Sequence, residues 1–181
     1  MTKFSIIKFS LITFLTFVFL DFLIGNYVYK KFIRINFLDV DISFSVKDDI
    51  YDHTFKKSYK GLAGWGERRH NLCTDANGFK NSCKNINDKT KKFDIGFIGD
   101  SFTEAVGIDY EKSFVGLISS EMKNKKIANL AVSSYSPTIY YTKINYLLSQ
   151  GYSFKEIIVF IDLSDLVDDT VCYELKNNIT V

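Results

Sequence analysis

A hydroxyl-bearing side chain follows a short apolar run near the middle of the chain, at Gly99-Asp100-Ser101. The run before it, residues 95–98, is typical of a buried strand, and such a strand would lift the Ser101 hydroxyl to the rim of a sheet. Rims at the carboxyl ends of parallel strands are where open α/β sheets bind ligands. A serine hydroxyl held there becomes a nucleophile when a base takes its proton. Ser101 is therefore the first candidate for chemistry.

Two further loops rich in small polar residues carry candidate serines, Ser134 within residues 133–137 and Ser164 within residues 162–165. Each loop follows a predicted strand, so in a parallel sheet both converge on the rim that holds Ser101. Taken singly, each serine is equally typical of a turn or a helix cap. The convergence of the three loops carries the hypothesis.

The elements that must position these loops alternate from residue 93 onward. Apolar runs predict strands at 94–98, 127–132 and 156–161, and 3.6-residue periodicity predicts helices at 111–123 and 138–150, the second capped by Gly151. This alternation indicates an α/β domain with a parallel sheet and right-handed crossovers. The unbroken apolar run of the third strand predicts that both faces of the sheet are covered.

The N-terminus is almost wholly apolar from residue 4 to residue 20. About 20 such residues are enough to cross a membrane, and Lys8 can extend its amine to the interface. We therefore predict a membrane anchor at 1–35. The alternatives are a cleaved signal peptide, although no small-x-small cleavage site follows the apolar run, and a buried core helix. Basic residues flank both ends, at Lys3 and Lys8 and at Lys30, Lys31 and Arg34, so the positive-inside rule does not decide the orientation.

Residues 36–92 lose this periodicity and predict an irregular lead-in to a domain at 93–181. Cys73 and Cys83 flank an Asn77-Gly78 turn, so a disulfide between them would close a short hairpin and suit an extracytoplasmic compartment. Two free buried thiols are the alternative. Cys172 is predicted to be a small core residue rather than a nucleophile.

Composition excludes several classes of function. The net charge of +2 is scattered rather than striped, so no nucleic-acid partner is expected. The two histidines, His53 and His70, lie in the polar lead-in and are expected to be solvated. His70, beside Arg68 and Arg69, has no acidic or cysteine partner at metal-ligand spacing, and the sequence contains no zinc pattern, so no metal and no cofactor are predicted.

The segment from residue 98 to residue 104, I-G-D-S-F-T-E, resembles the first signature block of the SGNH or GDSL hydrolase family. Residues 129–134 are similar to its second block and 162–165 to its third, and the resemblance runs from Asn77 to Asp169. It implies a three-layer α/β/α flavodoxin-like fold, of which this chain holds an incomplete parallel sheet. It also implies that Ser101 is the nucleophile and that Ser101, Ser134 and Ser164 mark the oxyanion hole.

The chain departs from the family pattern at the oxyanion positions and at the base. Ser134 stands where the family usually has a glycine, and Ser164 where it usually has an asparagine. The family's basic histidine, preceded by an aspartate near the C-terminus, has no counterpart downstream of Ser101. The expectation is a chain truncated before that histidine and inactive by itself, or else a degenerate one.

These observations predict a membrane-anchored SGNH-like serine hydrolase, an esterase or an O-acyl transferase, that acts on a small-molecule or glycan ester. Its N-terminal helix would contact membrane lipid, with the domain on the extracytoplasmic side. The alternative is a non-catalytic glycan- or peptide-binding module on a degenerate SGNH fold, which the missing base favours.

Overall fold

The computed structural model describes residues 3–29, 43–65, 68–173, 175–176 and 179–180. The chain divides into two compact units, Met1–Val40 and Asp41–Val181, each described here by itself.

The first unit is a single helical rod. Helix α1 (Lys3–Leu23) continues into one π-helical stretch, η1 (Ile24–Tyr29). Its span Ile7–Tyr27 has a mean hydropathy of 2.1, so it is long and apolar enough to cross a membrane. The hydroxyls of Thr13 and Thr16 donate to carbonyls one turn earlier, which satisfies these polar groups within the helix.

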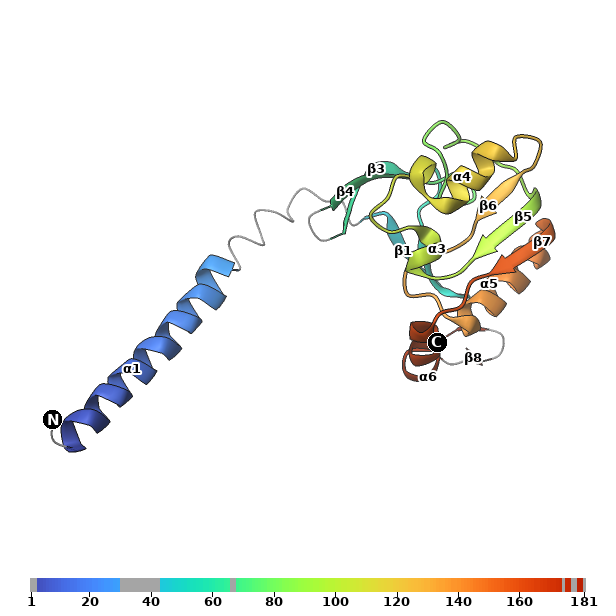
Figure 1. The fold of residues 1–181 in the computed structure, drawn as a ribbon. Helices are drawn as coiled ribbons and strands as arrows, with labels where there is room; N and C mark the ends of the chain where they lie inside the picture. The colour runs from blue at the N-terminus through green and yellow to red at the C-terminus, as the bar shows by residue number, and fades with distance from the viewer. Residues whose placement is uncertain (1–2, 30–42, 66–67, 174, 177–178, 181) are drawn as a thin grey trace. The chain divides into compact units, whose positions relative to one another are not determined.

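The second unit is a mixed α/β structure built on a small parallel sheet (Figure 1). The strands β5 (Lys92–Ile98), β6 (Ile127–Asn129) and β7 (Ser153–Val159) pair in the order β6-β5-β7. The two crossovers contain helices α4 (Phe114–Glu121) and α5 (Pro137–Ser149). Each predicted strand and helix is present, with ends shifted by a few residues.

The two crossover helices pack against separate core clusters. Val115 of α4 packs with Ile95 and Phe97 of β5, whereas α5 supplies side chains to a larger cluster that includes Ile98 and Leu130. Ser113 caps the start of α4 by accepting from the Gly116 amide. Gly151, with φ of +81°, ends α5 in the left-handed conformation that favours glycine.

Strand β7 departs from the prediction that the sheet is covered on both faces. Ile158 is 37% exposed and Ile161, just beyond the strand, is 60% exposed. Edge position is not the reason, because β6 is also an edge of this sheet and is buried. The core cluster of α4 includes residues of β5 and β6 but none of β7, so α4 leaves β7 uncovered.

The lead-in also differs from the irregular segment that the sequence predicted. It contains two antiparallel hairpins, one of β1 (Ser45–Asp48) with β2 (Asp52–Phe55) and one of β3 (Lys60–Trp65) with β4 (Arg68–Cys73). Four of their buried side chains belong to the larger core cluster, namely Tyr51, Phe55, Ala63 and Leu72. These strands are short and polar, so their pairing is stabilised by packing against the α/β core rather than by their own alternation.

The cysteines resolve one open alternative and correct one prediction. Cys73 and Cys83 form a disulfide, with their Cα atoms 5.0 Å apart. Cys172 is a free and exposed thiol, not the core residue that was predicted, because it follows the last turn of α6 (Leu163–Val171) at the surface. The remaining elements are short: α3 (Ser101–Glu104), η2 (Tyr110–Lys112), β8 (Leu175–Lys176) and β9 (Ile179–Thr180).

Candidate active site

Ser101 lies where the sequence predicted, on the tight turn that follows β5. It is the first residue of α3, and Asp100 caps this single turn by accepting from the Phe102 amide at 2.9 Å. The Ser101 hydroxyl is half-buried and donates to Asp100 Oδ2 at 3.2 Å. The turn therefore presents one hydroxyl beside a carboxylate at the rim.

Gly99 makes the turn possible. A Cβ atom at this position would lie 2.2 Å from Thr103 Oγ1 and 3.2 Å from the carbonyl oxygen of Phe160. Thr103 is fully buried, so it cannot swing out of the way. The glycine of the Gly-Asp-Ser motif thus has a local steric role, which lets α3 fold back against the end of the sheet.

The loop after β6 is bound through both peptide groups of Ser133, the one before it and the one after it. The Ser133 amide donates to Glu104 Oε2 at 2.6 Å, and the Ser133 carbonyl lies 2.8 Å from His53 Nε2. In a trans peptide the carbonyl of one residue and the amide of the next point in opposite directions. The contact with His53 therefore also fixes the direction of the Ser134 N–H, which has no hydrogen-bond acceptor among the described residues.

Two tyrosines hold the same loop. Tyr173 donates to the carbonyl of Ser134 at 2.8 Å, and Tyr135 donates to the backbone carbonyl of His53 at 2.6 Å. The His53 and Tyr135 rings meet edge to face at 5.0 Å. Ser134 has a φ of +65°, a conformation that favours glycine, the residue that the family resemblance places here. These contacts together hold a strained turn in one orientation.

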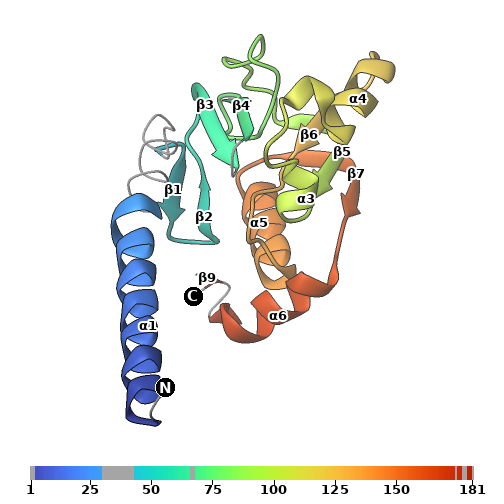
Figure 2. The same cartoon turned by 60° about the vertical axis from the view of Figure 1, so that its left-hand side comes forward.

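The chain runs from β7 into α6 (Figure 2). Ser164 lies in the first turn of α6 and has a different role. Asp162 and Asp165 form a capping box, and both the amide and the hydroxyl of Ser164 donate to Asp162 Oδ1. Both Ser164 donors are thus engaged in the helix cap. The structure gives Ser164 a structural contact and no free donor toward Ser101.

The three loops do converge, as predicted. Carboxylate oxygens of Asp100, Asp162 and Asp165 lie within 4.8 Å of one another, which joins the first loop to the third. The first and second loops are joined by the Glu104–Ser133 bond.

The cluster of Asp100, Asp162 and Asp165 is also the place in the described chain where a cation would find oxygen ligands. Asp165 Oδ2 accepts from Tyr140, while its buried Oδ1 has no hydrogen-bond partner in the described part of the chain. Burial raises the pKa of Asp165, and the hydrogen bond from the Ser164 hydroxyl lowers the pKa of Asp162. The sequence pattern did not predict this cluster, because its members come from two separate loops.

Glu104 is the most strongly perturbed carboxyl in this region. Burial raises its pKa to about 7, and the charge of the buried Lys80 opposes that rise. Lys80 donates to the carbonyls of Ala105 and Ile108 and so fixes the chain after α3. The first and second loops are therefore connected through an acid that is close to half-ionised at neutral pH.

The two histidines are not the solvated side chains that were predicted. His70 is buried, neither of its ring nitrogens has a hydrogen-bond partner among the residues that the structure describes, and desolvation lowers its pKa. His53 is half-buried, with Nδ1 at 2.7 Å from Asp52 Oδ2 and Nε2 on Ser133. Both partners of His53 are acceptors, so a ring with a proton on each nitrogen satisfies both. No local motif marks His53, because the β1–β2 hairpin brings it to the rim from far away in the sequence.

An apolar cavity of about 290 Å³ adjoins the Ser101 turn. Aromatic and aliphatic side chains form most of its wall, with two aspartates and a threonine at its edge. The lining residues are Asp100, Phe102, Thr103, Phe114, Phe160, Ile161 and Asp162. A cavity of this kind can hold the acyl part of an ester while its carbonyl lies at the rim.

Comparisons with known proteins add no family and no homologue to these geometric observations. No protein-family model matches the chain, and neither the curated proteins nor the solved structures contain a match.

Proposed function

We propose that this protein is a membrane-anchored serine hydrolase or acyl transferase of the SGNH type, acting on ester-linked acyl groups. The observation that supports it best is the relation of two loops. Ser101 stands on a glycine-dependent turn after β5, and the neighbouring loop holds the Ser134 amide in an orientation fixed by His53. The Glu104–Ser133 hydrogen bond joins the two loops, and a nucleophile together with an oriented amide is what acyl transfer requires.

In the proposed reaction the Ser101 hydroxyl oxygen attacks the acyl carbonyl and its proton passes to a base. The amides of Ser101 and Ser134 would stabilise the negative charge on the carbonyl oxygen. The alcohol then leaves with a proton, and water or an acceptor hydroxyl takes the acyl group from the serine. The cavity beside Phe102 would hold the acyl chain.

The proposed reaction also needs a base for the Ser101 proton. Among the described residues the Ser101 hydroxyl has Asp100 as its hydrogen-bond partner, and His53 is bound to Ser133 rather than to Ser101. No histidine follows Ser101 in the sequence. We therefore do not assign the proton acceptor to a residue of this chain.

The finer description of the fold belongs to the same proposal. We propose that the parallel sheet and its two crossover helices are part of a three-layer flavodoxin-like arrangement, and that α1 anchors it on the extracytoplasmic side. The Cys73–Cys83 disulfide supports that compartment, because such bonds persist in oxidising surroundings.

The test uses the protein expressed in its complete natural reading frame and a serine-reactive fluorophosphonate probe. Labelling at Ser101, together with turnover of an acetyl or short-chain aryl ester that Ser101→Ala abolishes, would support the proposal. Turnover that Ser101→Ala leaves unchanged would refute the assigned nucleophile. Ser120→Ala, on the exposed side of α4, is the matched control.

One observation favours a second function, the binding of a glycan or peptide at the rim without chemistry. Both donors of Ser164 are engaged with Asp162, which leaves the proposed oxyanion site one contributor short. A folded protein that binds an ester ligand but never reacts with the fluorophosphonate would favour this alternative.

A further inference from the structure

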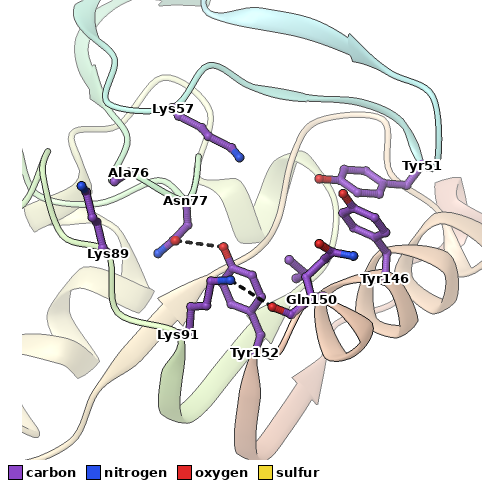
Figure 3. A pocket seen from close by; sticks show the side chains of 10 residues that line it. Tyr51, Lys57, Ala76, Asn77, Lys89, Lys91, Tyr146, Gln150 and Tyr152 are labelled. Carbon is purple, nitrogen blue, oxygen red and sulfur yellow. Dashed lines mark hydrogen bonds between the residues drawn. The ribbon is translucent and has the colours of Figure 1, made fainter.

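A second cavity, of about 300 Å³, lies in the α/β unit away from the Ser101 turn. Figure 3 shows its wall at close range. Its polar side chains are lysines, tyrosines and amides, and its apolar lining comes from an alanine and a leucine. The lining residues are Tyr51, Lys57, Ala76, Asn77, Lys89, Lys91, Tyr146, Leu147, Gln150 and Tyr152.

This cavity lies at the opposite end of the sheet from the candidate active site. Lys91 comes immediately before β5 and Tyr152 immediately before β7, so the cavity is at the amino ends of these strands. Ser101 follows the carboxyl end of β5. Seven strand residues separate the two ends, and at about 3.3 Å per residue they span roughly 20 Å. A ligand here would not reach Ser101.

The charge of the cavity wall has one sign. It contains three lysines and no acidic side chain. Lys57 points into the space between Asn77 and Tyr51 (Figure 3), and it forms no ion pair or hydrogen bond with any residue that the structure describes. Asp75, the neighbour of the lining residue Ala76, is buried and accepts hydrogen bonds from the amides of Asn77 and Phe79. An anion placed in the cavity would therefore meet an available ammonium group.

Part of the wall is already rigid. Lys91 donates to the carbonyl of Gln150 at 2.9 Å and lies 4.9 Å above the Tyr152 ring. The Tyr152 hydroxyl donates to Asn77 Oδ1 at 2.9 Å, as Figure 3 shows. These contacts tie the lead-in to the end of α5 and hold the amides and the ring in place before any ligand arrives.

Two tyrosine hydroxyls face Lys57 from the other side. Tyr51 and Tyr146 lie with their rings 5.8 Å apart, and both hydroxyls point into the cavity (Figure 3). Burial raises the pKa of Tyr51, so its hydroxyl remains protonated and neutral at physiological pH. The Tyr146 hydroxyl has no hydrogen-bond partner among the described residues. The wall opposite the ammonium therefore offers ring surface and neutral hydroxyls.

We infer that this cavity binds a sugar that carries an anionic group, with the charge on Lys57 and the sugar hydroxyls on the tyrosines and amides. A small inorganic anion would use the lysine and leave the aromatic wall unoccupied. A sugar ring presents CH groups to tyrosine faces and hydroxyls to amides, which matches both parts of the wall. The inference is independent of the chemistry proposed for Ser101.

The experiment is a titration of the full chain in detergent, followed by calorimetry and by saturation-transfer NMR. The probes are D-glucuronate, which carries a carboxylate, and D-glucose 6-phosphate, which carries a phosphate. D-Glucose and inorganic phosphate serve as comparisons, because one has the sugar without the charge and the other the anion without the sugar. We expect at least one anionic sugar to bind, and glucose and phosphate each to bind about tenfold more weakly or worse.

Variants locate the site. Lys57→Gln should weaken binding of the anionic sugar by about tenfold, and Tyr146→Phe by a few-fold, with unfolding temperatures unchanged because both groups lack internal partners. Lys123→Gln, an exposed lysine beyond α4, is the matched control. Binding that survives both cavity variants, glucose binding as tight as glucuronate, inorganic phosphate binding as tight as the sugar phosphate, or no binding by either anionic sugar would overturn the inference. Fluorophosphonate labelling of Ser101 should be the same in Lys57→Gln and wild type, which keeps this test separate from that of the proposed function.

Discussion

His53 Nε2 lies 2.8 Å from the carbonyl oxygen of Ser133 and so fixes the peptide group that carries the Ser134 amide. The opposite side of the same residue is held by Glu104, whose carboxylate accepts the Ser133 N–H. A histidine in an early hairpin and an acid in the turn after β5 thus orient the loop after β6. In the proposed reaction His53 is a positioning residue, since it acts through the amide and does not contact Ser101 in the described structure.

Replacing His53 tests this role. His53→Phe keeps a flat ring but removes the donor, so we expect fluorophosphonate labelling of Ser101 to slow by about tenfold or more, because an oxyanion donor is no longer aimed. His53→Gln restores an N–H near the Nε2 position and should recover part of the rate. With an ester that the protein hydrolyses, the loss of rate in His53→Phe should appear in kcat more than in KM.

The control for His53 is structural. Amide chemical shifts of Ser134 should move in His53→Phe and return toward wild type in His53→Gln, while the unfolding temperatures of the two variants stay close. Equal labelling rates in wild type and His53→Phe would contradict the positioning role.

The buried carboxyl of Glu104 should make the stability of the fold depend on pH. Burial raises its folded-state pKa to about 7 from an ordinary value near 4.5. The neutral acid is the favoured form in the fold, so its contribution to stability is fully present below pH 4.5 and is lost as the pH rises through about 7. The loss should amount to about 3 kcal/mol at most.

Glu104→Gln removes this titration and keeps an acceptor for the Ser133 amide. Thermal unfolding measured from pH 4.5 to pH 8 should show wild type falling relative to the variant. Glu121→Gln, at the exposed end of α4, should follow wild type throughout. Parallel curves for wild type and Glu104→Gln would show that Glu104 titrates as an ordinary carboxyl.

The buried amine of Lys143 should make the stability of the fold rise with pH in the alkaline range, opposite to the effect of Glu104. Its amine is buried, donates to the Leu130 carbonyl and the Tyr135 hydroxyl, and lies 4.7 Å from the Tyr135 ring centre. Burial lowers its pKa to about 7 from 10.5. The unfolded chain therefore holds more protons than the folded chain above pH 7, so stability should rise with pH, by about 2 kcal/mol between pH 7 and pH 9.

Lys143→Met removes the titrating group and fills a similar volume. Its unfolding temperature should lack the alkaline rise seen in wild type, measured by calorimetry in matched buffers. Lys126→Met, an exposed lysine just before β6, serves as the control. If wild type and Lys143→Met keep a constant difference from pH 7 to pH 9, the amine is not neutral in the fold.

The Cys73–Cys83 bond closes a loop of 10 residues. Loops of this size give a disulfide about 2–3 kcal/mol of stabilisation, chiefly by restricting the unfolded chain. Cys73→Ser with Cys83→Ser should therefore lower the unfolding temperature, and a reducing agent should lower that of wild type but not of the double variant. Cys172→Ser should leave stability unchanged, because that thiol is free and exposed.

The parts of the fold that the sequence predicted are those set by local patterns. Alternating apolar runs and helical periodicity located β5 and α5, and a positive-φ glycine ended α5 at Gly151 as expected. Gly99 and Ser101 were found for the same reason, since a tight turn after a strand has a local signature. Convergence of the three loops followed from parallel topology.

The parts that were missed depend on long-range pairing. The β1–β2 hairpin has little apolar alternation, so nothing local indicated that it packs on the core and brings His53 to the rim. Ser164 is engaged in the N-terminal cap of α6. The three-residue spacing between Asp162 and Asp165 is typical of a capping box and could have suggested this role. The exposure of Ile158 on β7 depends on which strands α4 covers, which an apolar run does not specify.

The bond between His53 and Ser133 joins residues 80 positions apart. Contacts of such separation form late, because a long stretch of chain must be ordered before they gain anything. We expect the rim to be completed after the β5 turn, because that turn needs only contacts between residues close in sequence. A reagent that reports on Ser101 would thus also measure the kinetics of the last folding steps, and partly folded chains would retain the Gly-Asp-Ser turn without a correctly directed Ser134 amide.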